Sequence, residues 1–140
     1  MNAQHFLDAV ARDLACDAAR AEAVTFAVFQ ELRDRLTPKE ADDVAAQLPT
    51  PLKALWSQGE ADRAPNQVNK IHAAELIGRV RRRAALVDDA EAERTVRVVF
   101  RALRTLLGSV SGLGGEAGDV FGQLPKDMRT LWLDLEPKTK

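Results

Sequence analysis

An internal duplication constrains this chain more than any other feature of its sequence. Residues 40–56 align without a gap with residues 116–132, and 9 of the 17 aligned positions are identical. Both copies contain Gln-Leu-Pro, at 47–49 and at 123–125, and both end in Leu-Trp. The chain therefore consists of two related halves, and we expect the two halves to fold alike.

The proline of each Gln-Leu-Pro is predicted to separate two helices. Pro49 and Pro125 have no backbone N–H and disfavour helical geometry in the preceding residue. Thr50 is suited to cap the next helix, with Pro51 at its first position. After the break, two aliphatic residues and a tryptophan share one helical face in each copy: Leu52, Leu55 and Trp56, then Met128, Leu131 and Trp132. Each tryptophan is therefore predicted to anchor a core, and the alternative of a stacking platform for a ligand fits this spacing less well.

The composition favours an all-α fold. The 140 residues include no Tyr, are rich in Ala, Leu, Val, Arg, Glu and Asp, and contain few runs of β-branched residues, so the composition as a whole favours helices over strands. We predict two tandem pseudo-symmetric helical bundles of about four helices each. A unit of about 70 residues buries only about 60% of its unfolded surface, so the halves are expected to need each other or a second chain.

The repeats suggest the following boundaries along the chain. Repeat one covers residues 1–57, a polar linker 58–70, repeat two 71–135 and a disordered tail 136–140. Asp17, Thr37 and Asp88 are expected to cap helices at their N-termini. The long helix of each repeat has a matching apolar stripe: Ala21, Val24, Val28, Phe29, Leu32 and Leu36 in the first, and Ala92, Val96, Val99, Phe100, Leu103 and Leu107 in the second.

Net charge and cysteine content indicate which classes of partner and which cellular compartment to expect. A net charge of −1 argues against a basic nucleic-acid-binding tail or a cationic membrane binder. A single cysteine, Cys16, can form no internal disulfide, and no apolar run approaches the roughly 18 residues of a membrane span. We therefore expect a cytoplasmic protein that does not bind membranes, with Cys16 as a partly buried filler.

No group of residues predicts catalysis. His72 and Glu75 have a spacing that suits a metal, but carboxylate-bridged sites need several such pairs directed at one point. His5 has no recognisable Ser or Cys partner. The glycine-rich segment 108–115 lacks the preceding strand and the Lys-Ser/Thr pair of a phosphate-binding loop, so it is predicted to be a flexible surface loop. We predict no catalytic residue, metal or cofactor.

The second long helix differs from the first on its outer face. An arginine stripe, which we define as Arg94, Arg97, Arg101 and Arg104, runs roughly opposite its apolar residues. The equivalent positions in the first repeat are Ala23, Phe26, Gln30 and Arg33. Phe26 points away from its own core, so we expect it to be covered by the other repeat or by a second chain.

Two interpretations of the arginine stripe remain open. With Arg79, Arg82 and Arg83 it can contact an anionic partner, such as an acidic protein or a phosphate backbone. No aromatic residue is interleaved with it, and Glu91 and Glu93 lie one turn away. A solvated face with helical ion pairs is therefore the favoured interpretation.

Several motifs carry a resemblance to a known family. Each half opens with an apolar helix, as in Phe-Leu-x-x-Val at 6–10, and continues through Val-Phe-x-x-Leu to Gln-Leu-Pro and Leu-Trp. In these features the chain resembles the bacterial domain-of-unknown-function 2267 family of small all-helical proteins, from about Phe6 to Trp132. The resemblance implies the fold but no activity, and segment 108–115 departs from the pattern. We therefore expect a non-catalytic helical interaction module that binds a protein partner or itself. The alternative is nucleic-acid or other polyanion binding through the arginine stripe.

Overall fold

Seven helices make up the regular structure of the residues that the computed structural model describes, which are 2–57, 72–107, 124 and 126–133. They are α1 Ala3–Leu14, α2 Ala18–Arg33, α3 Pro38–Gln47, α4 Thr50–Ser57, α5 Ala73–Arg83, α6 Asp89–Leu106 and α8 Lys126–Leu133. The predicted all-α class is confirmed. The predicted linker 58–70, the glycine-rich loop 108–115 and the tail 136–140 lie outside the described residues.

Side-chain caps fix the starts of several helices where the sequence predicted them. Asp17 accepts a hydrogen bond from the Arg20 N–H at the start of α2, and Asp88 accepts one from the Glu91 N–H at the start of α6. Thr37 caps α3 in the same way. These caps satisfy N–H groups that have no partner within the helix.

One predicted cap is wrong by a single residue. The Pro49 carbonyl accepts a hydrogen bond from the Lys53 N–H at 2.9 Å, so α4 already includes Thr50 as its first residue. Pro51 then occupies the second position, where its missing N–H again has no partner to lose. The predicted break between the two helices is otherwise present, because α3 ends at Gln47 and Leu48 is extended.

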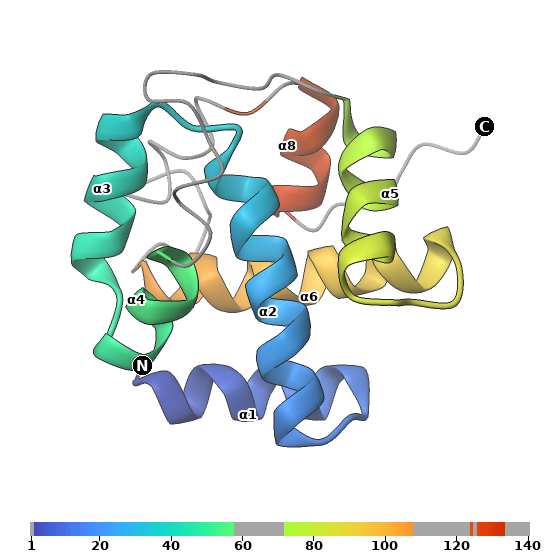
Figure 1. The fold of residues 1–140 in the computed structure, drawn as a ribbon, viewed down its shortest axis with the longest axis horizontal. Coiled ribbons are helices and arrows are strands. Elements are labelled where there is room, and N and C mark those ends of the chain that lie inside the picture. Colours follow the sequence, from blue (N-terminus) through green and yellow to red (C-terminus); the bar gives the residue numbers. More distant parts are fainter. Residues whose placement is uncertain (1, 58–71, 108–123, 125, 134–140) are drawn as a thin grey trace.

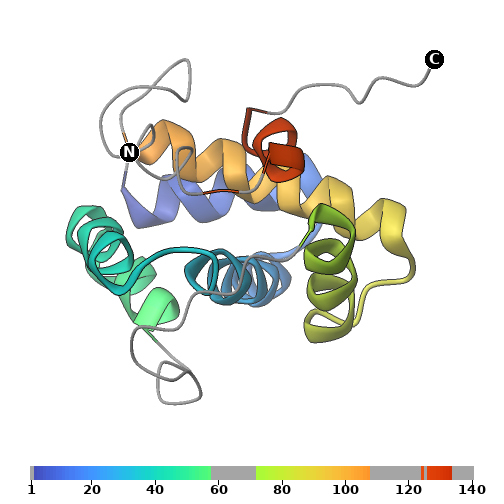
Figure 2. The same cartoon turned by 90° about the horizontal axis from the view of Figure 1, so that it is seen from above.

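The helices form two layers (Figures 1 and 2). In one layer α1 and α6 run side by side, and in the other α2 lies between α3 and α4 on one side and α5 on the other. Each long helix has corresponding neighbours, since α2 contacts α1, α4, α5 and α6, while α6 contacts α5, α8, α1 and α2. The first helix of each half therefore packs against the long helix of both halves.

The hydrophobic core is one continuous cluster to which both halves contribute. The side chains of Trp56 and Trp132 are 2% and 0% exposed, so the prediction that each anchors a core is confirmed. Phe29 lies edge-on to Trp56, and Phe100 lies edge-on to Trp132, with ring centroids 5.3 Å apart in both pairs. The edge-on contact stabilises each pair of rings in addition to the burial of their apolar surface. The two halves thus share one interior but repeat the same aromatic contact.

Among the helices described, none combines the length and the apolar character needed to cross a bilayer.

Candidate interaction site

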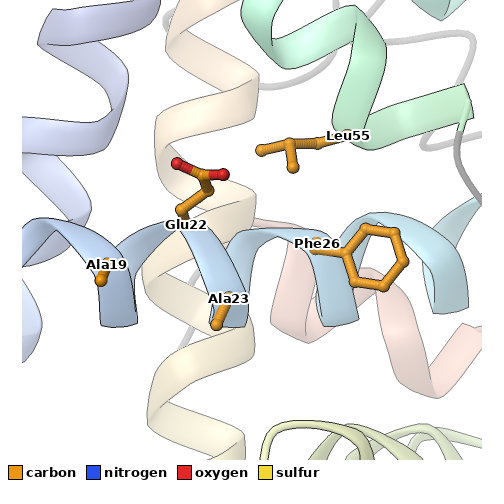
Figure 3. A pocket seen from close by; sticks show the side chains of 5 residues that line it. All are labelled: Ala19, Glu22, Ala23, Phe26 and Leu55. Carbon is orange, nitrogen blue, oxygen red and sulfur yellow. The ribbon is translucent and has the colours of Figure 1, made fainter.

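Phe26 lies at the edge of an open hollow on the surface of α2. The hollow has a volume of about 310 Å³ and is lined by Ala19, Glu22, Ala23, Phe26 and Leu55. The first four residues follow each other at helical spacing along α2, and Leu55 comes from α4 (Figure 3). The Phe26 side chain is half-buried against the core, whereas Ala19, Glu22 and Ala23 are exposed. We call this surface the Phe26 hollow.

Glu22 gives the Phe26 hollow a charged edge. Figure 3 shows its carboxylate on the side of α2 that faces Leu55, one helical turn before Phe26. Glu22 forms no ion pair with any of the described residues. The hollow therefore combines a largely apolar lining with one carboxylate that faces solvent.

The residues of the arginine stripe form contacts with other groups of the same molecule. Arg94 donates to the Asp13 carbonyl at the end of α1, and Arg101 Nη1 lies 3.4 Å from Asp13 Oδ2. Arg97 Nε donates to Glu93 Oε2 at 3.1 Å, and the Arg97 side chain is only 15% exposed. The stripe expected to face outward therefore also serves to attach α1 to α6. One helical ion pair of the expected kind is present, at Arg97, but that side chain is mostly buried rather than solvated.

Arg104, the last residue of the stripe, has an equivalent in the first repeat. Its Nη1 donates to the Trp132 carbonyl at 2.6 Å, and Arg33 Nη1 donates to the Trp56 carbonyl at 2.6 Å. Arginine at the C-terminal end of a short helix satisfies a carbonyl and opposes the negative end of the dipole. In the first repeat Gln30 adds a further hydrogen bond to the Trp56 carbonyl. The alignment of Arg104 with Arg33 is the sequence signal for this shared contact, although Arg33 lies 23 residues before Trp56 and Arg104 lies 28 residues before Trp132.

A buried ion cluster between α2 and α5 was missed by the sequence analysis. Glu31 accepts from Arg35 Nη1 at 3.2 Å, from Arg79 Nε at 3.0 Å and from Arg83 Nε at 2.7 Å. The side chains of Glu31 and Arg35 are 2% and 0% exposed, while those of Arg79 and Arg83 are 44% and 43% exposed. We call these four residues the Glu31 cluster. The only sequence signal for it was the four-residue spacing of Glu31, on α2, and Arg35, just after the end of that helix.

The arginines determine the charge state of Glu31. Burial alone would raise the pKa of this carboxyl, because it penalises the charged form. The hydrogen bonds from Arg83 and Arg35, together with their positive charges, outweigh burial and hold the pKa of Glu31 below its usual range. Glu31 is therefore a carboxylate at neutral pH, and it joins the first repeat to the second.

The remaining polar candidates do not assemble into a reactive group in the described part of the chain. His72 is exposed and occupies the N-cap position of α5 without a side-chain capping bond, so it lies before the helix rather than on it. Within the described ranges no three His, Cys, Asp or Glu side chains are placed to hold a metal ion. Cys16 is half-buried, and burial raises the pKa of its thiol, which suits the predicted filler rather than a nucleophile.

The sequence matches a family described as "Uncharacterized conserved protein (DUF2267)" over residues 3–131. No curated protein matches the sequence.

Proposed function

Since the chain belongs to the DUF2267 family, whose description assigns no activity, we propose a function from the surface of the molecule: it is a non-catalytic interaction module that binds a protein partner through the Phe26 hollow. The observation that carries this proposal is the half-buried Phe26 beside an open, largely apolar depression. We place the module in a reducing cytoplasm, which suits a chain whose one cysteine can form no internal disulfide.

The lining of the hollow suggests the type of partner. Residues 19, 22, 23 and 26 form one stripe along α2, and Leu55 borders it from α4. A stripe of this kind suits an amphipathic helix, which would place an aliphatic side chain beside Phe26. Glu22 favours a Lys or Arg next to that aliphatic residue in the partner. We therefore propose a helical segment with an apolar face and a basic edge as the bound element.

Polyanion binding by the arginine stripe is the weaker candidate. Arg94, Arg97 and Arg101 already contact Asp13 or Glu93, and Arg104 binds the Trp132 carbonyl. A phosphate backbone would have to compete with these contacts for the same guanidinium groups. Binding of this kind would also fall steeply as salt is added, because counterions are released.

A photo-crosslinker placed at Ala23 tests the proposal. Ala23 lines the hollow and is exposed, so a photoreactive residue there should crosslink the partner in the native cell, on the apolar face of a helix. Adding Phe26→Glu should lower the crosslink yield by about thirtyfold, since an aromatic hot-spot contact is worth about 2 kcal/mol. Mass spectrometry of the crosslinked peptides identifies the residues captured, including those of a second copy of the chain.

The matched control uses the apolar residue Val87, which is 82% exposed and is not one of the residues that line the hollow. Val87→Glu should leave the crosslink from position 23 unchanged, and chemical denaturation should show that both variants remain folded. Equal yields with and without Phe26→Glu would refute the proposal, as would captured peptides that share no apolar helical face.

A further inference from the structure

The Glu31 cluster contains more positive charge than its carboxylate neutralises. Three guanidinium groups surround Glu31, and Arg82 lies on the same helix as Arg79 and Arg83. The other carboxylates nearby are Asp34, whose charge acts on Arg35, and Glu75, one turn before Arg79 on α5. The four arginines outnumber these three carboxylates, and the three that belong to α5 are half-exposed or exposed.

The arrangement leaves donors available on α5. Arg79 and Arg83 each contact Glu31 through Nε, and neither forms another hydrogen bond or ion pair with any of the described residues. Arg82 is exposed and likewise has no such contact in the described ranges. A Cβ atom at Gly78 would lie 3.6 Å from Arg82 Nη1, so the Arg82 guanidinium folds back along α5 toward the preceding turn. At positions i, i+3 and i+4, the three arginines lie on one side of α5, and Glu31 holds two of them.

The buried carboxylate also holds two of these groups in place. Arginine normally loses side-chain freedom when it binds an anion, and this loss weakens binding. Arg79 and Arg83 have already lost much of their side-chain freedom, because Glu31 is 2% exposed and binds both at their Nε atoms. A planar guanidinium fixed along one edge still presents donors that match the oxygens of a phosphate.

We propose that Arg79, Arg82 and Arg83 form a binding site for the phosphate group of a small phosphomonoester. The site lies on the α5 side of α2, whereas the Phe26 hollow lies on the α4 side (Figure 1). It is a second binding function and does not depend on the proposed protein partner.

The spacing of the three arginines favours a single phosphate over a nucleic-acid backbone. They occupy positions i, i+3 and i+4 on α5, which covers about 6 Å along the helix axis. A backbone would need further basic groups in line with them. Arg81 is paired with Asp89, and the arginine stripe of α6 is engaged with Asp13, Glu93 and Trp132. The available donors therefore form a compact group rather than a track.

Titration of the isotope-labelled full chain with inorganic phosphate tests this site. The Nε–H groups of Arg79 and Arg83 bind Glu31, so their NMR signals report directly on the site. We expect these signals to shift saturably, with a dissociation constant of about 1 mM, and to shift far less with chloride at equal ionic strength. Phenyl phosphate should reproduce the effect, because it carries the same group on a small organic molecule.

Two variants and a control complete the test. Arg82→Gln removes a donor without touching Glu31 and should weaken phosphate binding by about tenfold. Arg83→Lys keeps the positive charge but loses the planar guanidinium group, and it should also weaken phosphate binding. Arg12→Gln, on an arginine of α1 that is 76% exposed, should bind phosphate as the unmodified protein does. A linear response matched by chloride would overturn the proposal. So would unchanged affinity in Arg82→Gln, or tighter binding of a short DNA duplex that shifts the α6 arginine signals as well.

Discussion

Replacing Glu31 with Gln is expected to lower the free energy of unfolding by about 3–5 kcal/mol, the range found when one partner of a buried ion pair is removed. The reason lies in Arg35, whose side chain is 0% exposed and would lose its ion pair while remaining buried. Arg79 and Arg83 are half-exposed and can turn toward water. Chemical denaturation followed by circular dichroism measures the loss.

The control for this prediction removes a partner that water can replace. Arg79→Gln leaves the Glu31–Arg35 pair intact and deletes a side chain that is 44% exposed, so its cost should be about 1 kcal/mol or less. Equal losses for Glu31→Gln and Arg79→Gln would show that the buried pair has no special importance.

The pH dependence of the same variant provides a second check. Because the pKa of Glu31 is lowered in the folded protein, its contribution is present above its unfolded pKa, about 4.3. That contribution is lost as the pH falls through the lower folded value. The stability difference between the unmodified protein and Glu31→Gln should therefore be constant near neutral pH and narrow below about pH 4.3. A difference that widens on acidification would contradict the assigned charge state.

Truncation of either tryptophan is the second change with a large expected effect. Trp132→Ala and Trp56→Ala should each cost about 3–5 kcal/mol, because each removes a buried ring and leaves a cavity beside a phenylalanine. Trp56→Ala also removes the hydrogen bond from its Nε1 to the Ala41 carbonyl at 3.0 Å. Both values follow from denaturation midpoints and slopes measured on the purified variants.

A surface truncation sets the scale for these losses. Val87→Ala removes a side chain that is 82% exposed and should change stability by no more than about 0.5 kcal/mol. If Trp132→Ala cost no more than Val87→Ala, the second indole could not be an anchor of the core.

The features predicted well from the sequence are those that depend on nearby residues. Asp17 and Asp88 cap their helices because capping needs only a side chain and an N–H three residues on. The apolar stripes are buried because their helical period decides which residues share a face. The two tryptophans were assigned to the core on the same basis, and both are buried.

The features that escaped prediction depend on partners far away in the chain. Glu31 and Arg83 are 52 residues apart, and nothing in the periodicity of α2 indicates that α5 will supply two arginines to it. Arg94 reaches a backbone carbonyl 81 residues earlier, and such an acceptor has no sequence signature. The arginine stripe was correctly placed on one helix, but its tertiary contacts followed from the packing of α1 against α6. Phe26 was expected to be covered, and its half-burial at an open hollow makes it the leading candidate for partner binding.

Unfolding of two single-tryptophan variants tests most directly the central claim that both halves share one core. Trp56→Phe leaves Trp132 as the only indole, and Trp132→Phe leaves Trp56, so fluorescence reports on one half at a time. Because the core is one cluster, we predict that in each variant fluorescence and far-ultraviolet circular dichroism follow a single coincident transition. A fluorescence transition displaced from the circular dichroism transition in either variant, with one half unfolding before the other, would contradict the account.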